Sequence, residues 1–225
     1  MRSLILITAL LACPAVMAQQ NISRVNGAIQ TEAGARYGTL ETVNGAISVE
    51  SGVSAGEVET VNGSIRVAEN ASIVSAETVN GSILIGENVV VKGDLESVSG
   101  RVDVGAGTHI GGDIEVVNGI ITLTRARIDG DVEGVNGGIN LHGSQVGGDI
   151  ESVNGDILIG RDSVVRGDLI MHKKRGFSFG FGASRKPKVT IEAGATVEGR
   201  LRFEREVELS ISPEAKVQHA DAVEG

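Results

Sequence analysis

Apolar and polar residues alternate along short stretches of this chain, and each stretch lies at a fixed distance from a repeated tripeptide, Val-Asn-Gly. The residue three positions after each Asn is Ile or Val, and the residue two positions further on is apolar in every repeat but the first. Such alternation of β-branched residues predicts a short strand that buries one face. A second alternating stretch precedes each Asn. We expect it to bury an apolar residue such as Leu40 or Leu95, followed by the Val of the tripeptide.

The tripeptide recurs with an almost constant period. Successive copies are 18 or 19 residues apart when Val-Ser-Gly at residues 98–100 is counted as one of them. A fixed period of this size indicates a stack of one repeated unit. Because a third, shorter apolar stretch lies between the other two, we predict an all-β fold, a triangular parallel β-helix. The alternative, a meander of hairpins with Asn-Gly turns, would not require the same tripeptide at every step.

The tripeptide itself predicts a corner of this solenoid. Asn and Gly both tolerate a positive φ, so the pair can form a sharp bend that most residues could not. Successive Asn side chains would lie one strand spacing apart, ~4.8 Å, where their amides can hydrogen-bond along the column. The predicted corner residues are Asn26, Asn44, Asn62, Asn80, Asn118, Asn136 and Asn154.

Residues 1–18 predict a secretory signal peptide. Arg2 precedes an apolar run that is too short to span a bilayer, and Ala18 is a small residue at the expected cleavage point. The alternative is a lipoprotein that is anchored through Cys13. Either way, we expect an exported protein of the periplasm or cell surface, without a transmembrane segment in the mature chain.

The repeat pattern is interrupted once. Residues 19–172 follow it, residues 173–188 do not, and residues 189–225 resume it and end in a predicted terminal cap. The insertion contains basic residues and three of the four Phe, a combination that suits an anionic membrane surface or an acidic partner. The acidic face of a second copy is one such partner. The alternative is a tolerated surface insertion whose Phe residues fold over the core. The candidate contact residues are Lys173, Lys174, Arg175, Phe177, Phe179, Phe181, Arg185, Lys186 and Lys188.

Two columns of acidic residues also repeat, and both should face outward because they flank inward apolar residues. Stacked like charges are destabilising, so either water and salt screen them or a cation binds there. Carboxylate oxygens suit Ca²⁺, or the columns could bind a basic partner. The alternative is a solvated acidic face that keeps the rod soluble. The candidate residues are Asp94, Glu96, Asp113, Glu115, Asp131, Glu133, Asp149 and Glu151.

Composition excludes some classes of function. The formal net charge is −9, which disfavours nucleic-acid binding, since phosphate contacts need clustered Lys and Arg. Aromatic residues make up 2% of the chain, so stacking platforms for sugars or bases are few. No nucleophile or acid–base group recurs around the four His residues. We therefore expect no enzyme activity and no cofactor.

Residues 110–114 (Ile-Gly-Gly-Asp-Ile), 165–169 (Val-Arg-Gly-Asp-Leu) and 195–201 resemble the bactofilins, which are bacterial polymer-forming cytoskeletal proteins. The Val-Asn-Gly-x-Ile units are also similar to the repeats of exported bacterial adhesins. The resemblance covers most of residues 22–203. It implies a right-handed β-helix and end-to-end self-assembly without nucleotide, with no catalytic residues.

Together these features predict an exported, non-enzymatic β-solenoid with a structural or adhesive role at the bacterial cell envelope. Its expected partners are further copies of itself and an envelope surface, either anionic lipid or polysaccharide. The alternative is a β-helix that binds or acts on an envelope or extracellular polysaccharide.

Overall fold

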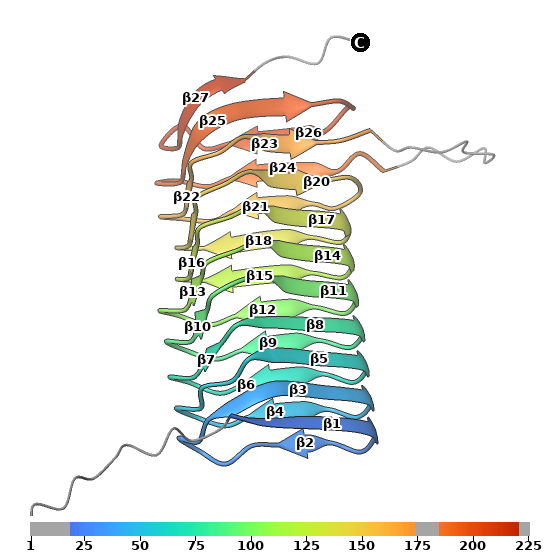
Figure 1. Ribbon diagram of the computed structural model, residues 1–225. Helices are drawn as coiled ribbons and strands as arrows, with labels where there is room; N and C mark the ends of the chain where they lie inside the picture. The colour runs from blue at the N-terminus through green and yellow to red at the C-terminus, as the bar shows by residue number, and fades with distance from the viewer. Residues whose placement is uncertain (1–18, 174–184, 221–225) are drawn as a thin grey trace, which may run out of the picture.

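The computed structural model describes residues 19–173 and 185–220. The predicted signal peptide and most of the insertion lie outside this range. Within it the chain forms strands and turns and no helix, and every strand pairing is parallel. The strands follow one another around a three-sided coil that rises along a single axis (Figure 1). This confirms the predicted fold class, a parallel β-solenoid.

The first side of the coil carries the longest strands, which end at the Val-Asn-Gly tripeptide in most turns. These strands are β1 (Gln20–Asn26), β3 (Tyr37–Asn44), β5 (Glu57–Asn62), β8 (Ser75–Asn80), β11 (Leu95–Ser99), β14 (Ile114–Asn118), β17 (Val132–Asn136), β20 (Ile150–Ser152), β23 (Leu169–Met171), β25 (Thr196–Phe203) and β27 (Lys216–Ala220). We call their outward side the acidic face.

The second side follows the tripeptide and forms a ten-stranded sheet with one strand per turn. Its strands are β2 (Ile29–Gln30), β4 (Ile47–Val49), β6 (Ile65–Val67), β9 (Ile83–Ile85), β12 (Val102–Val104), β15 (Ile121–Thr124), β18 (Ile139–His142), β21 (Ile157–Ile159), β24 (Lys188–Ile191) and β26 (Glu208–Ile211). The insertion falls between β23 and β24, at the start of this side.

The third side is the shortest, with two residues in each of its strands. These are β7 (Ser72–Ile73), β10 (Val90–Val91), β13 (His109–Ile110), β16 (Arg127–Ile128), β19 (Gln145–Val146) and β22 (Val164–Val165). We call its outward side the short-strand face. The first part of β25 continues it, since Thr196 and Val197 pair with Val164 and Val165.

Equivalent residues of successive turns pair directly, so each position of the repeat forms a column along the rod. Leu40 pairs with Val58, and Ile47 pairs with Ile65. The inward columns fill the interior with Ile, Val and Leu, whose side chains are almost fully buried. A rod of this kind is stabilised mainly by contacts between neighbouring turns.

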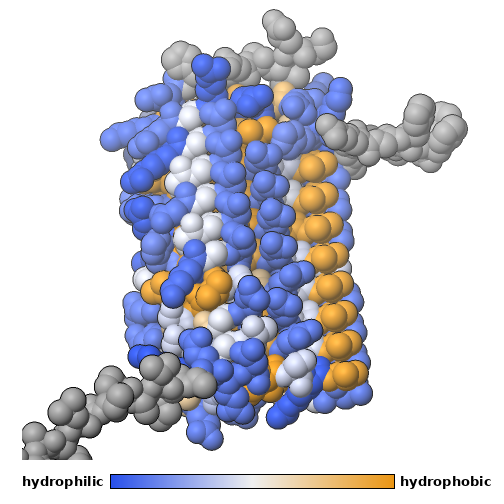
Figure 2. Space-filling model, in the orientation of Figure 1, coloured by the Kyte–Doolittle hydropathy of each residue, from blue (hydrophilic) through white to orange (hydrophobic). Residues whose placement is uncertain are grey.

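The Val of the tripeptide does not belong to this core, so the expectation that it faces inward is wrong. Side chains alternate along a strand. With Leu40 inward, Thr42 is therefore the next inward residue and Val43 points out. Thr42 is 1% exposed, whereas Val61 is 40% exposed. The exposed Val residues form a narrow apolar stripe along one edge of the rod (Figure 2).

Candidate functional site

The corner at the tripeptide is a ladder of Asn side chains. The Nδ2 of each Asn donates to the Oδ1 of the Asn one turn earlier, at 3.0 Å from Asn44 to Asn26 and 2.9 Å from Asn62 to Asn44. The same bond joins Asn80 to Asn62, Asn136 to Asn118 and Asn154 to Asn136. We call this column the Asn ladder. Its side-chain stacking agrees with the sequence prediction, and its role is structural.

The reason for Gly at this corner differs from the one predicted. None of the ladder Asn residues has a positive φ, and most of the following Gly residues lie outside the left-handed region as well. A Cβ at Gly63 or Gly81 would instead overlap the carbonyl group of the Gly one turn earlier. Gly is therefore required because two backbones approach each other closely. The inward-facing Thr residues of the first side also hydrogen-bond to this corner. Thr60 Oγ1 donates to the Gly45 carbonyl oxygen at 2.9 Å, and Thr42 and Thr78 make the equivalent bonds.

The left-handed corner lies elsewhere, two residues before each short strand. Nearly every residue of this column is Gly, Asn or Asp, and all have positive φ: Gly34, Gly52, Asn70, Asn88, Gly107, Arg125, Gly143, Asp162 and Gly194. Asn and Asp adopt this conformation more readily than other residues with side chains. Arg125, with a φ of 45°, is the exception. A left-handed residue other than Gly costs on the order of 1 kcal/mol.

The Asp column of the acidic face is hydrogen-bonded to the backbone of the next turn. Asp94 Oδ1 accepts from the Asp113 N–H at 2.9 Å, and Asp113 Oδ1 accepts from the Asp131 N–H at 2.8 Å. The same relay continues through Asp149 and Asp168. We call this column the Asp ladder. One oxygen of each carboxylate is thus committed to the backbone, which gives these candidate cation ligands a structural role.

The Glu column of the acidic face is different, because its carboxylates stack without such bonds. Within the described residues, His172 is the only basic side chain that pairs with it, through Glu151. Burial and the neighbouring carboxylates raise the pKa of Glu59, Glu96 and Glu133. We call the column the Glu ladder: Glu41, Glu59, Glu77, Glu96, Glu115, Glu133 and Glu151.

Residues 174–184, which include Lys174, Arg175, Phe177, Phe179 and Phe181, lie outside the described residues, so their predicted contact role stays a prediction. The flanks of the insertion are described, and they bind acidic residues of this chain. Arg185 pairs with Asp156 at 2.6 Å, and Lys186 pairs with Glu206 at 2.8 Å. The Lys188 N–H donates to Asp156 at 2.8 Å, and the Lys173 N–H donates to Glu204 at 3.3 Å.

His172, the residue before the insertion, joins two turns. Its Nε2 lies 2.7 Å from Glu151, and its Nδ1 lies 3.3 Å from Glu204. These hydrogen bonds raise the pKa of His172. Beside it, Arg205 donates to Asn154 Oδ1 at 3.1 Å and so occupies the last acceptor of the Asn ladder. The base of the insertion is therefore held by side chains from several turns.

Sequence reasoning missed one cluster, which lies on the short-strand face. Arg125, Arg127, His109 and Gln145 line a hollow of about 380 Å³ with Gly107 and Gly143. Asp129 bridges two of these residues, at 2.7 Å from His109 and 2.8 Å from Arg127. The signal was present in the sequence, because Arg125 departs from a column that otherwise contains Gly, Asn and Asp. We call this hollow the Arg125 notch.

No group of three or more His, Cys, Asp or Glu side chains in the described residues is arranged to hold a metal ion. In the same part of the chain, none of the residues forms a helix that could cross a membrane.

The architecture thus defines a repeat protein of the parallel β-solenoid class. Comparison with protein-family models, with curated proteins and with solved structures gave no match to this chain. The solenoid therefore rests on the structure, and the resemblances to bactofilins and adhesins stay predictions.

Proposed function

We propose that this chain is an exported structural rod of the bacterial cell envelope that assembles end to end. The main evidence for assembly is that apolar side chains of the last turn are exposed. In β26, Leu209 is 40% exposed and Ile211 is 38% exposed. Their partners in the turn below, Val189 and Ile191, are 0% and 1% exposed. The last turn therefore presents an inward-type apolar column that a further turn would bury.

The backbone at both ends supports the same proposal. In the described part of the chain, β1 and β2 pair with strands on one side only, as do β26 and β27. A strand with a free edge is a template for pairing with another chain. The two ends are different surfaces, so their contact is head to tail and generates an open filament rather than a closed ring.

The described part of the predicted terminal cap leaves the last turn uncovered. Up to residue 220, the segment that starts at 189 continues the solenoid with ordinary turns, and all four residues of β26 are exposed. A capping segment normally covers the end of the stack with a polar surface. Here Pro213 follows β26, and the apolar side chains of Leu209 and Ile211 remain exposed beside it.

The test places a charge on the exposed end. Leu209→Lys should prevent stacking, because a buried Lys without a partner is strongly unfavourable at the new junction. Ser210→Lys is the matched control, since Ser210 lies in the same strand but on the outward side. Sedimentation velocity of the purified chain should show large assemblies for the unmodified and Ser210→Lys chains and a monomer for Leu209→Lys. Equal assembly of all three would refute the proposal.

A further inference from the structure

The Arg125 notch combines strain, space and positive charge at one place on the short-strand face. Arg125 holds a left-handed backbone, with a φ of 45°, where the turns below and above it have Gly107 and Gly143. A Cβ at Gly143 would lie 3.4 Å from Arg125 Cγ, so the Arg125 side chain extends over this Gly, and neither Gly adds a side chain to the hollow. Backbone strain of this kind is concentrated at functional sites. A Gly or Asn here would satisfy the fold better than Arg does.

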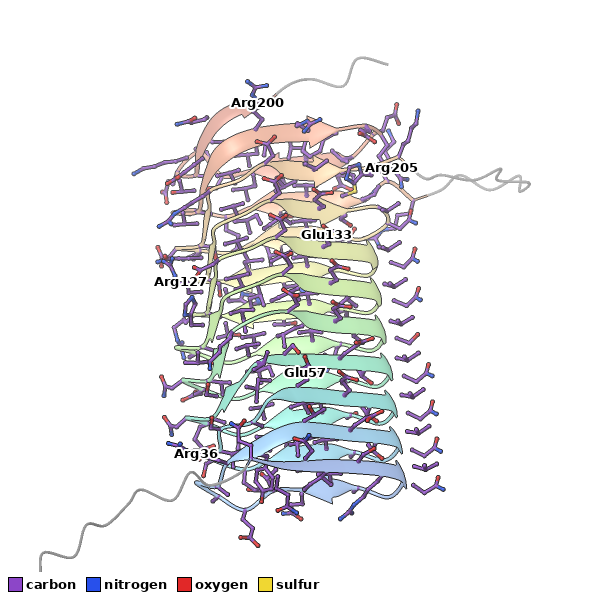
Figure 3. The ribbon with its side chains drawn as sticks, viewed as in Figure 1. Arg36, Glu57, Arg127, Glu133, Arg200 and Arg205 are labelled. Carbon is purple, nitrogen blue, oxygen red and sulfur yellow. The ribbon has the colours of Figure 1, made fainter. Side chains whose placement is uncertain are left out.

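The charge of the notch contrasts with the rest of the molecule. The chain carries a net charge of −9, and the neighbouring side of the rod carries the Glu and Asp ladders. In Figure 3, Arg127 lies at the left edge of the rod, whereas Glu57 and Glu133 lie near the middle of the view, on strands β5 and β17 of the acidic face. The residue before the left-handed corner is Glu69 or Glu87 in earlier turns. It is His142 and Arg161 in the two turns after Arg125.

The donors of the notch are partly fixed in place. Asp129 accepts from His109 at 2.7 Å and from Arg127 at 2.8 Å, and these contacts hold both side chains toward the same side. Within the described residues, no acidic side chain pairs with Arg125. Arg125 lines the hollow together with Gln145, so its guanidinium fork is within reach of a ligand there. A planar fork of this kind matches the oxygens of a carboxylate or a phosphate.

We propose that the Arg125 notch binds an oxyanion carried by a small polar molecule, a sugar acid or a sugar phosphate. The hollow of about 380 Å³ lies at the small end of the range for ligand sites. Its lining has no aromatic residue and is rich in donors, which favours a polar, anionic ligand over an apolar one. The proposal does not depend on end-to-end assembly, since the notch lies on the side of the rod.

The test uses a variant that should remove binding without harming the fold. Arg125→Gly replaces the strained residue by the one found in the turns below and above. Calorimetric titration at low ionic strength would use glucuronate, inorganic phosphate and neutral glucose. The unmodified chain should bind the two anions and not glucose, and Arg125→Gly should weaken anion binding at least tenfold. Arg36→Gln is the matched control, since Arg36 lies on the same face but several turns away, and it should bind as the unmodified chain does.

Two further measurements are the relative affinities for glucuronate and phosphate and the melting temperature of Arg125→Gly. Tighter binding of glucuronate than of phosphate would identify the sugar acid as the ligand, and equal binding would show that the oxyanion alone is recognised. The melting temperature of Arg125→Gly should be equal to or higher than that of the unmodified chain, because relief of the left-handed strain offsets the added freedom of Gly in the unfolded chain. Undiminished anion binding by Arg125→Gly would overturn the proposal, as would no anion binding by the unmodified chain.

Discussion

A Gly precedes each later Asp of the Asp ladder because the carboxylate one turn below occupies the space of its side chain. A Cβ at Gly112 would overlap Asp94 Oδ1, and a Cβ at Gly130 would overlap Asp113 Oδ1. The Gly and the Asp of each pair therefore act together. The Gly leaves room for the carboxylate of the turn below, and the Asp provides the carboxylate that the next turn binds. The repeat of this dipeptide follows from the stacking of turns.

This close contact between Gly and carboxylate predicts a large difference in stability between two similar Gly→Ala substitutions. Gly112→Ala should destabilise the rod by about 1–3 kcal/mol, because the new methyl group collides with Asp94 and with the backbone. Gly93→Ala should cost much less, since the turn below has Ser75 in place of Asp and the nearest atom lies 3.3 Å from the new Cβ. Thermal unfolding of both variants checks the prediction. Equal losses would show that the carboxylate does not set the requirement for Gly.

The Asn ladder has one gap, at Ser99, which pairs with Asn80 below and Asn118 above. Ser99→Asn should join the two halves through two new amide hydrogen bonds. Each such bond contributes about 0.5–1.5 kcal/mol, with the low end expected at an exposed corner. The melting temperature of Ser99→Asn should therefore rise. Ser48→Asn, on the second side of the coil, is the control and should leave it unchanged. A lower melting temperature for Ser99→Asn would contradict the account.

At the scale of an element, the Glu ladder makes stability depend on pH. The pKa values of Glu59, Glu96 and Glu133 are raised in the folded chain, so the folded state binds protons more tightly than the unfolded state. Stability should therefore rise as the pH falls through the raised pKa values toward the ordinary Glu value of 4.5. The raised pKa of His172 acts in the same direction. The lowered pKa values of Asp129 and Glu204 act in the opposite direction. The stability that these two carboxylates contribute is lost as the pH falls below their ordinary pKa range.

The measurement is the melting temperature as a function of pH. The combined variant Glu59→Gln, Glu96→Gln and Glu133→Gln should melt higher than the unmodified chain at pH 7, by about 2–4 °C for each kcal/mol of relieved repulsion. Its pH dependence should also be flatter. Glu198→Gln removes a carboxylate outside the ladder and serves as the control. A variant curve parallel to that of the unmodified chain would remove the ladder as the cause.

The period of the sequence was enough to predict the solenoid and the columns, because each turn must repeat the same buried alternation. The period could not show which contacts fix each residue. The sequence pattern predicts that the Val of the tripeptide belongs to the core, yet the alternation of side chains along the strand places Thr42 inside. The Asn-Gly pair suggested a left-handed corner, yet that conformation lies at the column that contains Arg125. Both differences come from contacts between turns, which are distant in sequence.

At the scale of the whole molecule, the middle turns and the end turns of the rod differ in their number of neighbours. Each turn inside the rod has a turn below and above it, whereas the first and last described turns each have one neighbour. The repeat that stabilises the middle is therefore the same interaction that a second copy could make at an end. Growth of the rod by further copies would extend its columns without a new kind of contact.

The most direct test of end-to-end assembly is electron microscopy of the purified chain over a range of concentrations. End-to-end assembly predicts unbranched filaments one solenoid wide, with the ~4.8 Å strand spacing along the filament axis. Filaments should be absent from the Leu209→Lys variant under the same conditions. Single short rods at every concentration, with no filaments of the unmodified chain, would contradict end-to-end assembly.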